Sequence, residues 1–143
     1  MYDISQVQSE YKTKLIDADF AASLVKSNYR LHFGVGTGSS IYMDRALGKR
    51  LKTDTLLRGL EIQTEVAVRN DLLETFKATR DVDTVRFYSS HYTGMDRMMT
   101  DAGNCWYVPI LFNEEPLYWG QEGNGFDICC IQVAPMDRYG NFN

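Results

Sequence analysis

The sequence lacks any long hydrophobic run. Within its 143 residues, no stretch approaches the roughly 20 consecutive apolar residues that span a bilayer. Residues 1–14 also lack the apolar segment of a secretory signal peptide. We therefore expect a cytoplasmic protein that has no contact with membranes.

Cysteine and histidine are both scarce. The three cysteines are Cys105, Cys129 and Cys130, an odd number, and two of them are adjacent in an apolar run. This pattern favours reduced, buried thiols, and a redox-active vicinal pair is the less favoured alternative. The two histidines, His32 and His91, are far apart in sequence and follow no Cys/His ligand spacing, so we expect no metal site.

An excess of positive charge is also missing. The chain has 15 Lys and Arg residues against 19 Asp and Glu residues, for a net charge of −4. A mildly acidic domain attracts neither nucleic acid nor an anionic membrane surface, although a local basic pocket for a phosphate is not excluded. Repeats and linker-like segments are absent, so we expect one domain, large enough to bury a core without disulfides or metals.

Apolar periodicity predicts strands that alternate with helices. Period-two or fully apolar segments predict strands over residues 30–35, 61–68, 84–88, 105–111 and 126–133. Helical spacing or capping residues predict helices over residues 5–15, 17–26, 43–51, 70–77, 95–102 and 115–121. This order is typical of an α/β fold with three layers and a mostly parallel sheet.

Three of these elements carry more specific expectations. Residues 126–133 are apolar on both faces, so we expect an interior strand that is covered on both sides. In the helix after residue 40, Met43 and Leu47 are expected to be buried, and Asp44 is expected to face water. In the strand over residues 61–68, Ile62, Val66 and Val68 are expected on the apolar side.

The sharpest local motif is the glycine-rich loop Gly34-Val35-Gly36-Thr37-Gly38-Ser39-Ser40 after the first predicted strand. Its spacing departs from the dinucleotide-binding fingerprint, because Ser39 or Ile41 stands where the last glycine or alanine is needed. It is no P-loop, because no Gly-Lys-Ser/Thr follows. Two interpretations remain open. The loop is a tight turn with Ser39 or Ser40 as a helix cap, or its backbone contacts a ligand.

Two further loops follow strands and should reach the same end of the sheet, where α/β proteins bind ligands. One is Ser89–Gly94, in which His91 either faces a ligand or packs in the loop. His32, within the first strand, is interpreted as a packed core histidine. The other loop follows Val133, and its Asp137–Gly140 segment has the composition of a turn.

Several of these segments together resemble a known family. They are Tyr11-Lys12-x-Lys14-Leu15, Arg30-x-His32-Phe33-Gly34 with its glycine loop, Ser90–Arg97, and the block Ile131–Asn143, which is the most specific of the four. The chain resembles the N-terminal domain of acetyl-CoA hydrolase/transferases, in particular the butyryl-CoA:acetate and 4-hydroxybutyrate branch. The resemblance covers nearly the whole chain, and the chain covers about the first third of such an enzyme.

The resemblance implies a NagB/RpiA/CoA-transferase-like fold and a double displacement through a glutamyl-CoA thioester. The attacking glutamate would belong to a C-terminal domain beyond Asn143, so no catalytic residue is assigned here. The implied substrate-binding residues are Gly36, Thr37, Gly38, Ser39, His91 and Met136. The carboxylates of this chain match no catalytic motif and are interpreted as solvated; they are Glu61, Glu65, Glu114, Glu115 and Glu122.

The implied partners are an acyl-CoA, a small carboxylate, the C-terminal domain of the same enzyme and further copies of the chain. Coenzyme A would be a substrate, and no cofactor is expected. The loop departs from the family in having Ser40 where proline is common, and Tyr139 and Asn141 replace a histidine and an aromatic residue. The chain ends directly after its most apolar strand and a turn, and we expect it to be truncated. The alternatives are an acetyl-CoA hydrolase, or a non-catalytic module that binds a nucleotide or sugar phosphate.

Overall fold

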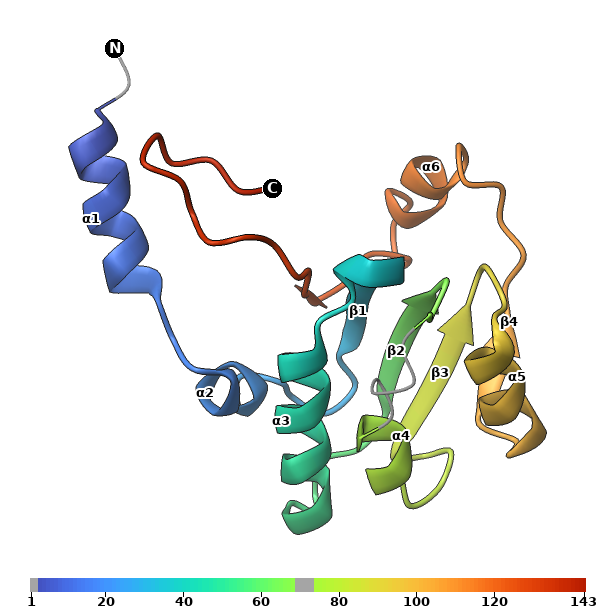
Figure 1. Cartoon of the computed structure of the whole chain (residues 1–143). Coiled ribbons are helices and arrows are strands. Elements are labelled where there is room, and N and C mark those ends of the chain that lie inside the picture. Colours follow the sequence, from blue (N-terminus) through green and yellow to red (C-terminus); the bar gives the residue numbers. More distant parts are fainter. Residues whose placement is uncertain (1–2, 69–73) are drawn as a thin grey trace.

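The protein is described by a computed structural model that covers residues 3–68 and 74–143 (Figure 1). Helices and strands alternate along most of the chain. The strands are β1 (Arg30–Val35), β2 (Leu60–Glu65), β3 (Val85–Ser89), β4 (Cys105–Tyr107) and β5 (Ile128–Cys129). The helices are α1 (Ile4–Lys14), α2 (Ala18–Ser23), the 3₁₀ turn η1 (Gly36–Gly38), α3 (Ile41–Thr53), α4 (Glu74–Ala78), α5 (Gly94–Asp101) and α6 (Glu115–Trp119).

The five strands form one sheet in the order β4-β3-β2-β1-β5, and every neighbouring pair is parallel. Parallel neighbours need crossover connections, which α3, α4 and α5 supply between successive strands. This arrangement confirms the predicted α/β class. All strands therefore end at one edge of the sheet, where η1 and the Ser89–Gly94 loop lie.

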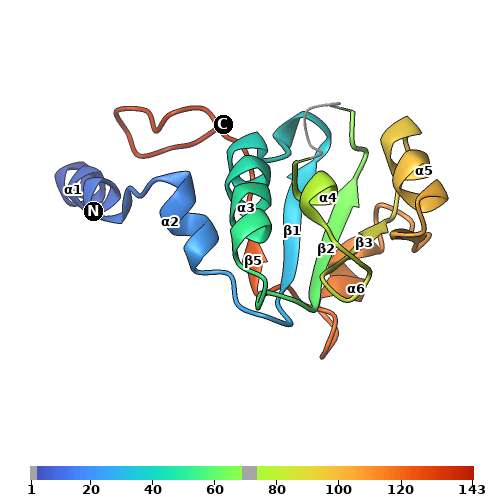
Figure 2. The ribbon, with the colours of Figure 1, turned by 90° about the horizontal axis from the view of Figure 1, so that it is seen from below.

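The two faces of the sheet differ in chemistry. On one face, Leu31, Ile62 and Phe87 are buried in the core, and α3 contributes Leu47 and Leu51. Figure 2 shows α3 and α4 side by side over this face. The intervening strand positions point to the opposite face and are mostly polar; they include Arg30, His32, Glu61, Gln63, Glu65 and Tyr88. That second face is covered by the short helix α6 and the segments around it.

The expectation for residues 126–133 is wrong in one respect. Only Ile128–Cys129 form a strand, and β5 is the edge strand of the sheet rather than an interior one. Ile131 is 66% exposed and Val133 is 42% exposed. An apolar composition on both faces indicates that the segment is suited to burial. It does not determine the position of the strand in the sheet or which elements cover it.

Two further expectations are corrected at the β2–α4 connection. The strand ends at Glu65 because Val66 adopts a left-handed backbone conformation with φ of 47°, and Val68 is exposed. Asp44 is 2% exposed instead of facing water. Its carboxylate accepts hydrogen bonds from the backbone N–H groups of Glu74 and Thr75 at the start of α4, at 2.9 and 3.0 Å. Part of the helix predicted over residues 70–77 lies outside the described residues.

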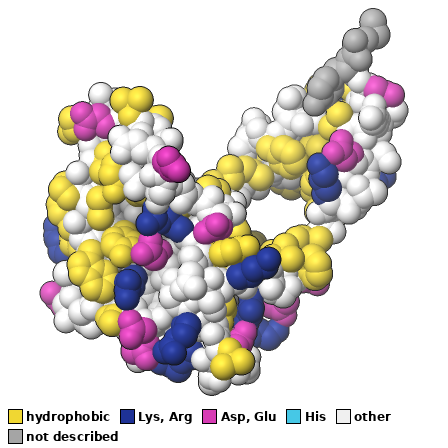
Figure 3. Space-filling view, turned by 180° about the vertical axis from the view of Figure 1, so that it is seen from behind, with side chains coloured by type: hydrophobic (Ala, Val, Ile, Leu, Met, Phe, Trp, Pro, Cys, Tyr) yellow, Lys and Arg dark blue, Asp and Glu magenta, His cyan; other side chains and the backbone are white. Residues whose placement is uncertain are grey.

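The C-terminal segment leaves the sheet and returns along α1 (Figure 1). The side-chain amide of Gln8 donates to the carbonyl of Arg138 at 2.9 Å, and the rings of Tyr11 and Phe142 are 5.7 Å apart. In Figure 3 this pair of segments projects from the body of the molecule and carries apolar side chains on its surface. Over the described ranges 3–68 and 74–143, no helix is both long and apolar enough to cross a membrane.

Candidate functional site

The turn after β1 has a backbone that only glycine accommodates. Gly34 has φ of +86°, and a Cβ atom there would lie 2.5 Å from the carbonyl oxygen of Gly38. Ser39 closes the turn, because its hydroxyl donates to the carbonyl of Gly36 at 2.8 Å. Ser40 caps α3 by accepting from the N–H of Met43, as the sequence predicted for one of these two serines. The turn is therefore held tightly, and Thr37 is exposed at its tip.

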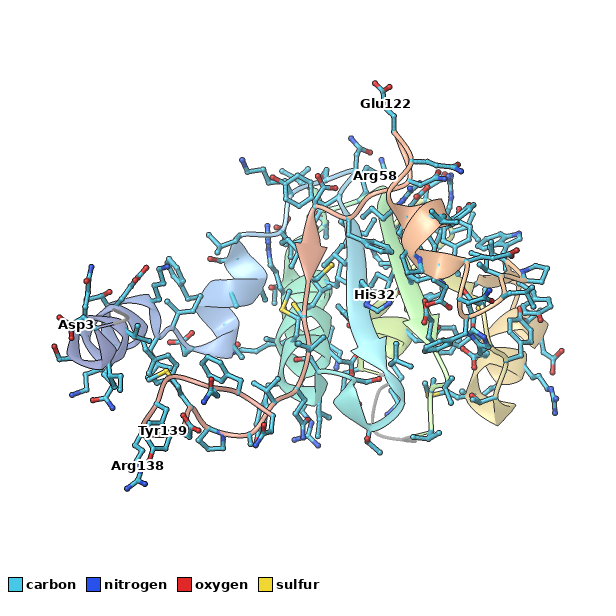
Figure 4. All side chains as sticks on the ribbon, turned by 90° about the horizontal axis from the view of Figure 1, so that it is seen from above. Asp3, His32, Arg58, Glu122, Arg138 and Tyr139 are labelled. Carbon is cyan, nitrogen blue, oxygen red and sulfur yellow. The ribbon has the colours of Figure 1, made fainter. Side chains whose placement is uncertain are left out.

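The structure joins this turn to the residues that follow β5. The N–H of Gln132 donates to the carbonyl of Gly38 at 2.7 Å, and Ser39 forms a bridge with Ile131. The turn over residues 135–141, which includes the half-buried Met136, lies farther along against α1. Figure 4 shows Arg138 and Tyr139 of this turn away from the sheet. Of the residues predicted for the site, the turn after β1 brings together Gly36, Thr37, Gly38 and Ser39, and Met136 lies apart from them.

His91 is held at the same edge of the sheet by its neighbours. Ser90 accepts a hydrogen bond from the buried side-chain amide of Gln63 at 2.7 Å, and the carbonyl of His91 accepts from the N–H of Val66 at 3.3 Å. Thr93 and Asp96 form a capping box that starts α5 directly after this loop. The loop geometry therefore fixes the backbone at His91.

Four ionisable side chains converge on the polar face of the sheet under α6. They are His32 of β1, Glu65 at the end of β2, His91 after β3, and Glu115, the first residue of α6. Nδ1 of His91 lies 3.5 Å from Oε1 of Glu115. The side chains of Glu65 and Glu115 are only 1% and 12% exposed. Both histidines of the chain thus lie in one cluster with two buried carboxyl groups.

The geometry around His32 assigns the tautomer of its ring. The N–H of Gly34 donates to Nδ1 at 3.1 Å, so Nδ1 is an acceptor and the proton of the neutral ring is on Nε2. That Nε2 lies 3.4 Å from Oε1 of Glu65. Phe126 packs against the His32 ring, with centroids 5.0 Å apart. Figure 4 shows His32 on β1 beside β2. His32 therefore donates toward Glu65 and orients it.

The two carboxyl groups of the cluster influence each other. Burial raises the pKa of Glu115, the neighbouring charge of Glu65 raises that pKa further, and His91 and His32 partly offset the rise. Oε2 of Glu65 and Oε1 of Glu115 are buried without a hydrogen-bond partner among the described residues. Two ionised carboxylates can only accept hydrogen bonds, so their close approach requires a proton or a cation between them.

The low exposure of Glu65 and Glu115 corrects the sequence interpretation, in which both carboxylates are solvated. His32 is packed, as expected, but it also makes a polar contact with Glu65. A sequence signal existed for two of the three residues, because His32 and Glu65 occupy polar positions of otherwise apolar alternating strands. Glu115 gave no such signal, since its position depends on how α6 folds back over the sheet.

Two cavities adjoin this face. One of about 140 Å³ lies beneath α6 and is lined by aromatic side chains together with Arg30, Glu61 and Gln63. The other, of about 840 Å³, opens at the amino ends of the strands. Four of its charged residues form two pairs, with Arg30 2.7 Å from Glu61 and Arg86 3.2 Å from Asp83. Parallel sheets bind ligands at the carboxyl ends of their strands, so the candidate site is the edge with the turn and the cluster.

Comparison with known proteins gives one family over the entire chain. The profile of the acetyl-CoA hydrolase/transferase N-terminal domain matches residues 1–143. A butyryl-CoA:acetate CoA-transferase from Anaerostipes caccae is 32% identical over 95% of this chain and 29% of its own length. A probable butyrate:acetyl-CoA coenzyme A-transferase from Syntrophomonas wolfei is also 32% identical, over 94% of this chain. The chain spans about 29% of the length of these relatives.

The fold recurs in a solved structure. The crystal structure of RipA from Yersinia pestis superposes with a TM-score of 0.78 and covers 99% of this chain and 33% of RipA. The two sequences are 22% identical, so this likeness supports the fold alone.

A 4-hydroxybutyrate coenzyme A transferase from Clostridium kluyveri is 28% identical over 91% of the chain.

Proposed function

Because the chain belongs to the acetyl-CoA hydrolase/transferase family as its N-terminal domain, we propose that the complete protein transfers CoA from a short-chain acyl-CoA to a small carboxylate such as acetate. The observation that carries the proposal is the match along the whole chain to CoA-transferases of this specificity. The proposed site of action is the cytoplasm, and the proposed assembly is a homo-oligomer.

In this proposal the reaction is a double displacement on a glutamate of the part that follows Asn143. The glutamate attacks the acyl-CoA thioester and expels the CoA thiolate, which leaves an acyl-glutamyl anhydride. The thiolate then attacks the glutamyl carbonyl and releases the donor carboxylate, which gives the glutamyl-CoA thioester. The incoming carboxylate attacks that thioester and expels the thiolate, and the thiolate attacks the acyl carbonyl of the second anhydride, which forms the new acyl-CoA and frees the glutamate. Covalent catalysis of this kind divides one difficult step into easier ones. Coenzyme A enters as a substrate, and this chemistry needs no cofactor.

The N-terminal domain would supply one wall of the pocket for the carboxylate. The turn at Gly36–Gly38 supports this role, because its backbone is exposed at the carboxyl end of β1 and Thr37 offers a hydroxyl at its tip. The hydroxyl of Ser39 is already donated to Gly36, so Thr37 is the better donor to a substrate. Neutral donors bind a carboxylate without adding a full charge.

The exposed apolar residues of the β5 edge support contact with the C-terminal domain. Ile131 and Val133 lie a few residues after β5 and are 66% and 42% exposed. Burial of apolar surface is the main driving force for packing of one domain on another. We propose that the remainder of the enzyme covers this edge.

The test is an assay of the full-length protein with butyryl-CoA and acetate that follows acetyl-CoA. Acetate-dependent formation of acetyl-CoA is the expected result. Release of free CoA at the same rate without acetate would instead identify a hydrolase, since water would then accept the acyl group. Absence of any reaction with short acyl-CoAs would leave only a shared fold.

A pair of matched variants tests the wall. Thr37→Val removes the hydroxyl at the turn and should lower kcat/KM for acetate roughly 10- to 150-fold, because hydrogen bonds to charged groups contribute about 1.5–3 kcal/mol. Thr13→Val makes the same change on the exposed surface of α1 and should leave kcat/KM unchanged. An equal decrease in kcat/KM for the two variants would show that Thr37 does not bind the substrate.

A further inference from the structure

The cluster under α6 has a property that the transferase chemistry does not use. Glu65, His91 and Glu115 each present one ligand atom, and these three atoms lie within 4.8 Å of one another. We propose that these three residues form a binding site for a divalent first-row metal ion, with Zn²⁺ as the representative cation. The inference does not depend on the proposed reaction.

The distances are close to those that a metal ion requires. Ligand bonds of about 2.1 Å in a tetrahedral site separate the ligand atoms by roughly 3.4 Å. Nδ1 of His91 and Oε1 of Glu115 are already 3.5 Å apart. The pairs that involve Glu65 lie within 4.8 Å, so they have to shorten by no more than about 1.4 Å to reach the spacing of a tetrahedral site.

An unpartnered, buried carboxylate oxygen points to a ligand that satisfies it. Glu65 is 1% exposed, and its Oε2 finds no hydrogen-bond donor among the described residues. Nδ1 of His91 and Oε1 of Glu115 are likewise buried and unpartnered over those residues. Leaving such groups unsatisfied costs free energy, and more so for a charged group. One cation satisfies all three atoms together.

The charges of the cluster favour a cation over neutral partners. Two carboxyl groups approach each other here, and the two imidazoles beside them are uncharged unless protonated. A divalent ion neutralises both carboxylates and accepts the imidazole lone pair. One nitrogen with two oxygens is a donor set of intermediate softness, which suits Zn²⁺, Mn²⁺ or Fe²⁺ better than Mg²⁺ or Ca²⁺.

His32 completes the arrangement as a positioning residue. Its Nε2 faces Oε1 of Glu65, and its Nδ1 is occupied by the N–H of Gly34. Oε1 of Glu65 is thereby held, and Oε2 remains available to the metal. Partners that orient a ligand in this way tune the affinity of metal sites.

This inference replaces the expectation of no metal site, which rested on the separation of the two histidines in sequence. Separation in sequence does not keep ligands apart in a parallel sheet, because the sheet places Glu65 at the end of β2 and His91 in the loop after β3 at the same edge. Three protein ligands also leave a coordination position for water or another small donor, as open metal sites do.

The test uses the full-length protein after removal of metals with a chelator, titrated with Zn²⁺ by calorimetry. Saturable binding with a micromolar or lower Kd is expected, with a rise of several degrees in Tm. Glu65→Gln and His91→Ala should each weaken binding at least tenfold. Glu61→Gln is the matched control, because Glu61 lies on the same face of the same strand but pairs with Arg30. No saturable binding, or equal loss in the Glu61→Gln variant, would overturn the proposal.

A spectroscopic measurement keeps the proposal testable if a variant fails to fold. X-ray absorption of Zn²⁺ bound to the unmodified protein should show only nitrogen and oxygen ligands at about 2.0–2.1 Å, with the scattering pattern of one imidazole. Sulfur ligands at about 2.3 Å would place the ion on cysteines such as the adjacent Cys129 and Cys130, and would also overturn it.

Discussion

Nε2 of His32 lies 3.4 Å from Oε1 of Glu65, across the boundary between strands β1 and β2. The parallel register pairs His32 with Gln63, so Glu65 lies one step farther along the same face. The contact is polar, nearly sealed from water on the Glu65 side, and oriented by the N–H of Gly34. It links the glycine turn to the carboxylate cluster.

The first prediction concerns this pair. His32→Phe keeps an aromatic ring against Phe126 but leaves Oε1 of Glu65 buried without its donor. We expect a loss of about 1–3 kcal/mol in the free energy of unfolding, measured in denaturant. In a Glu65→Met background the same His32 change should cost clearly less, since no carboxylate is left unpaired. Equal costs in the two backgrounds would mean that the His32 contribution is packing alone.

The second prediction concerns the close approach of α3 and α4. A Cβ atom on Gly48 would lie 2.5 Å from the backbone carbon of Glu74, and backbone cannot move aside cheaply. Gly48→Ala should therefore lower the unfolding free energy by about 1–3 kcal/mol, despite the better helix propensity of alanine. Gly94→Ala is the control, because nothing lies within 4 Å of its added methyl group. It should be neutral or slightly stabilising by thermal melting.

The third prediction concerns Asp44. Its buried carboxylate accepts the N–H groups of Glu74 and Thr75 and so caps α4 from a neighbouring helix. Asp44→Ala should cost about 2 kcal/mol, because two buried donors lose their acceptor. Asp19→Ala removes an acidic residue that pairs with Lys49 at the surface, and should cost under about 1 kcal/mol. A smaller loss at Asp44 than at Asp19 would contradict the capping role.

The fourth prediction concerns thiol reactivity. Burial raises the pKa of the Cys105 thiol to about 11, so at pH 8 only about one molecule in a thousand carries the reactive thiolate. Cys129 is exposed on the edge strand, although burial of part of its surface also raises its pKa. Iodoacetamide should modify Cys129 in the folded chain well before Cys105. Mass spectrometry of samples taken over time measures the two modification rates. In denaturant the two rates should become similar.

The fifth prediction concerns the 143 residues by themselves. We expect no CoA transfer from this chain alone, because by the family resemblance the attacking glutamate belongs to the part that follows. Loss of a covalent nucleophile costs many orders of magnitude in rate. Acetyl-CoA formation from butyryl-CoA and acetate above a buffer blank would show that a carboxylate of this chain can serve as the nucleophile.

The sequence by itself determined the alternation of strands and helices, the tight glycine turn and the family. These features are local, since they depend on apolar periodicity, on the conformational freedom of Gly34 and on short motifs such as Ile131–Asn143. It also correctly predicted that Ser39 or Ser40 caps the next helix, and Ser40 does so. Local propensity and patterning act over a few residues, and a sequence displays them directly.

Only the tertiary structure decided the edge position of β5, the burial of Asp44 and the meeting of Glu65, His91 and Glu115. Each of these features depends on which distant segment packs against the residue in question. No local sequence pattern predicts the strand order or the path of α6. A carboxylate is solvated by default, because burial without partners is costly. It becomes a buried functional group when the fold brings complementary groups to it, here His32 from the neighbouring strand.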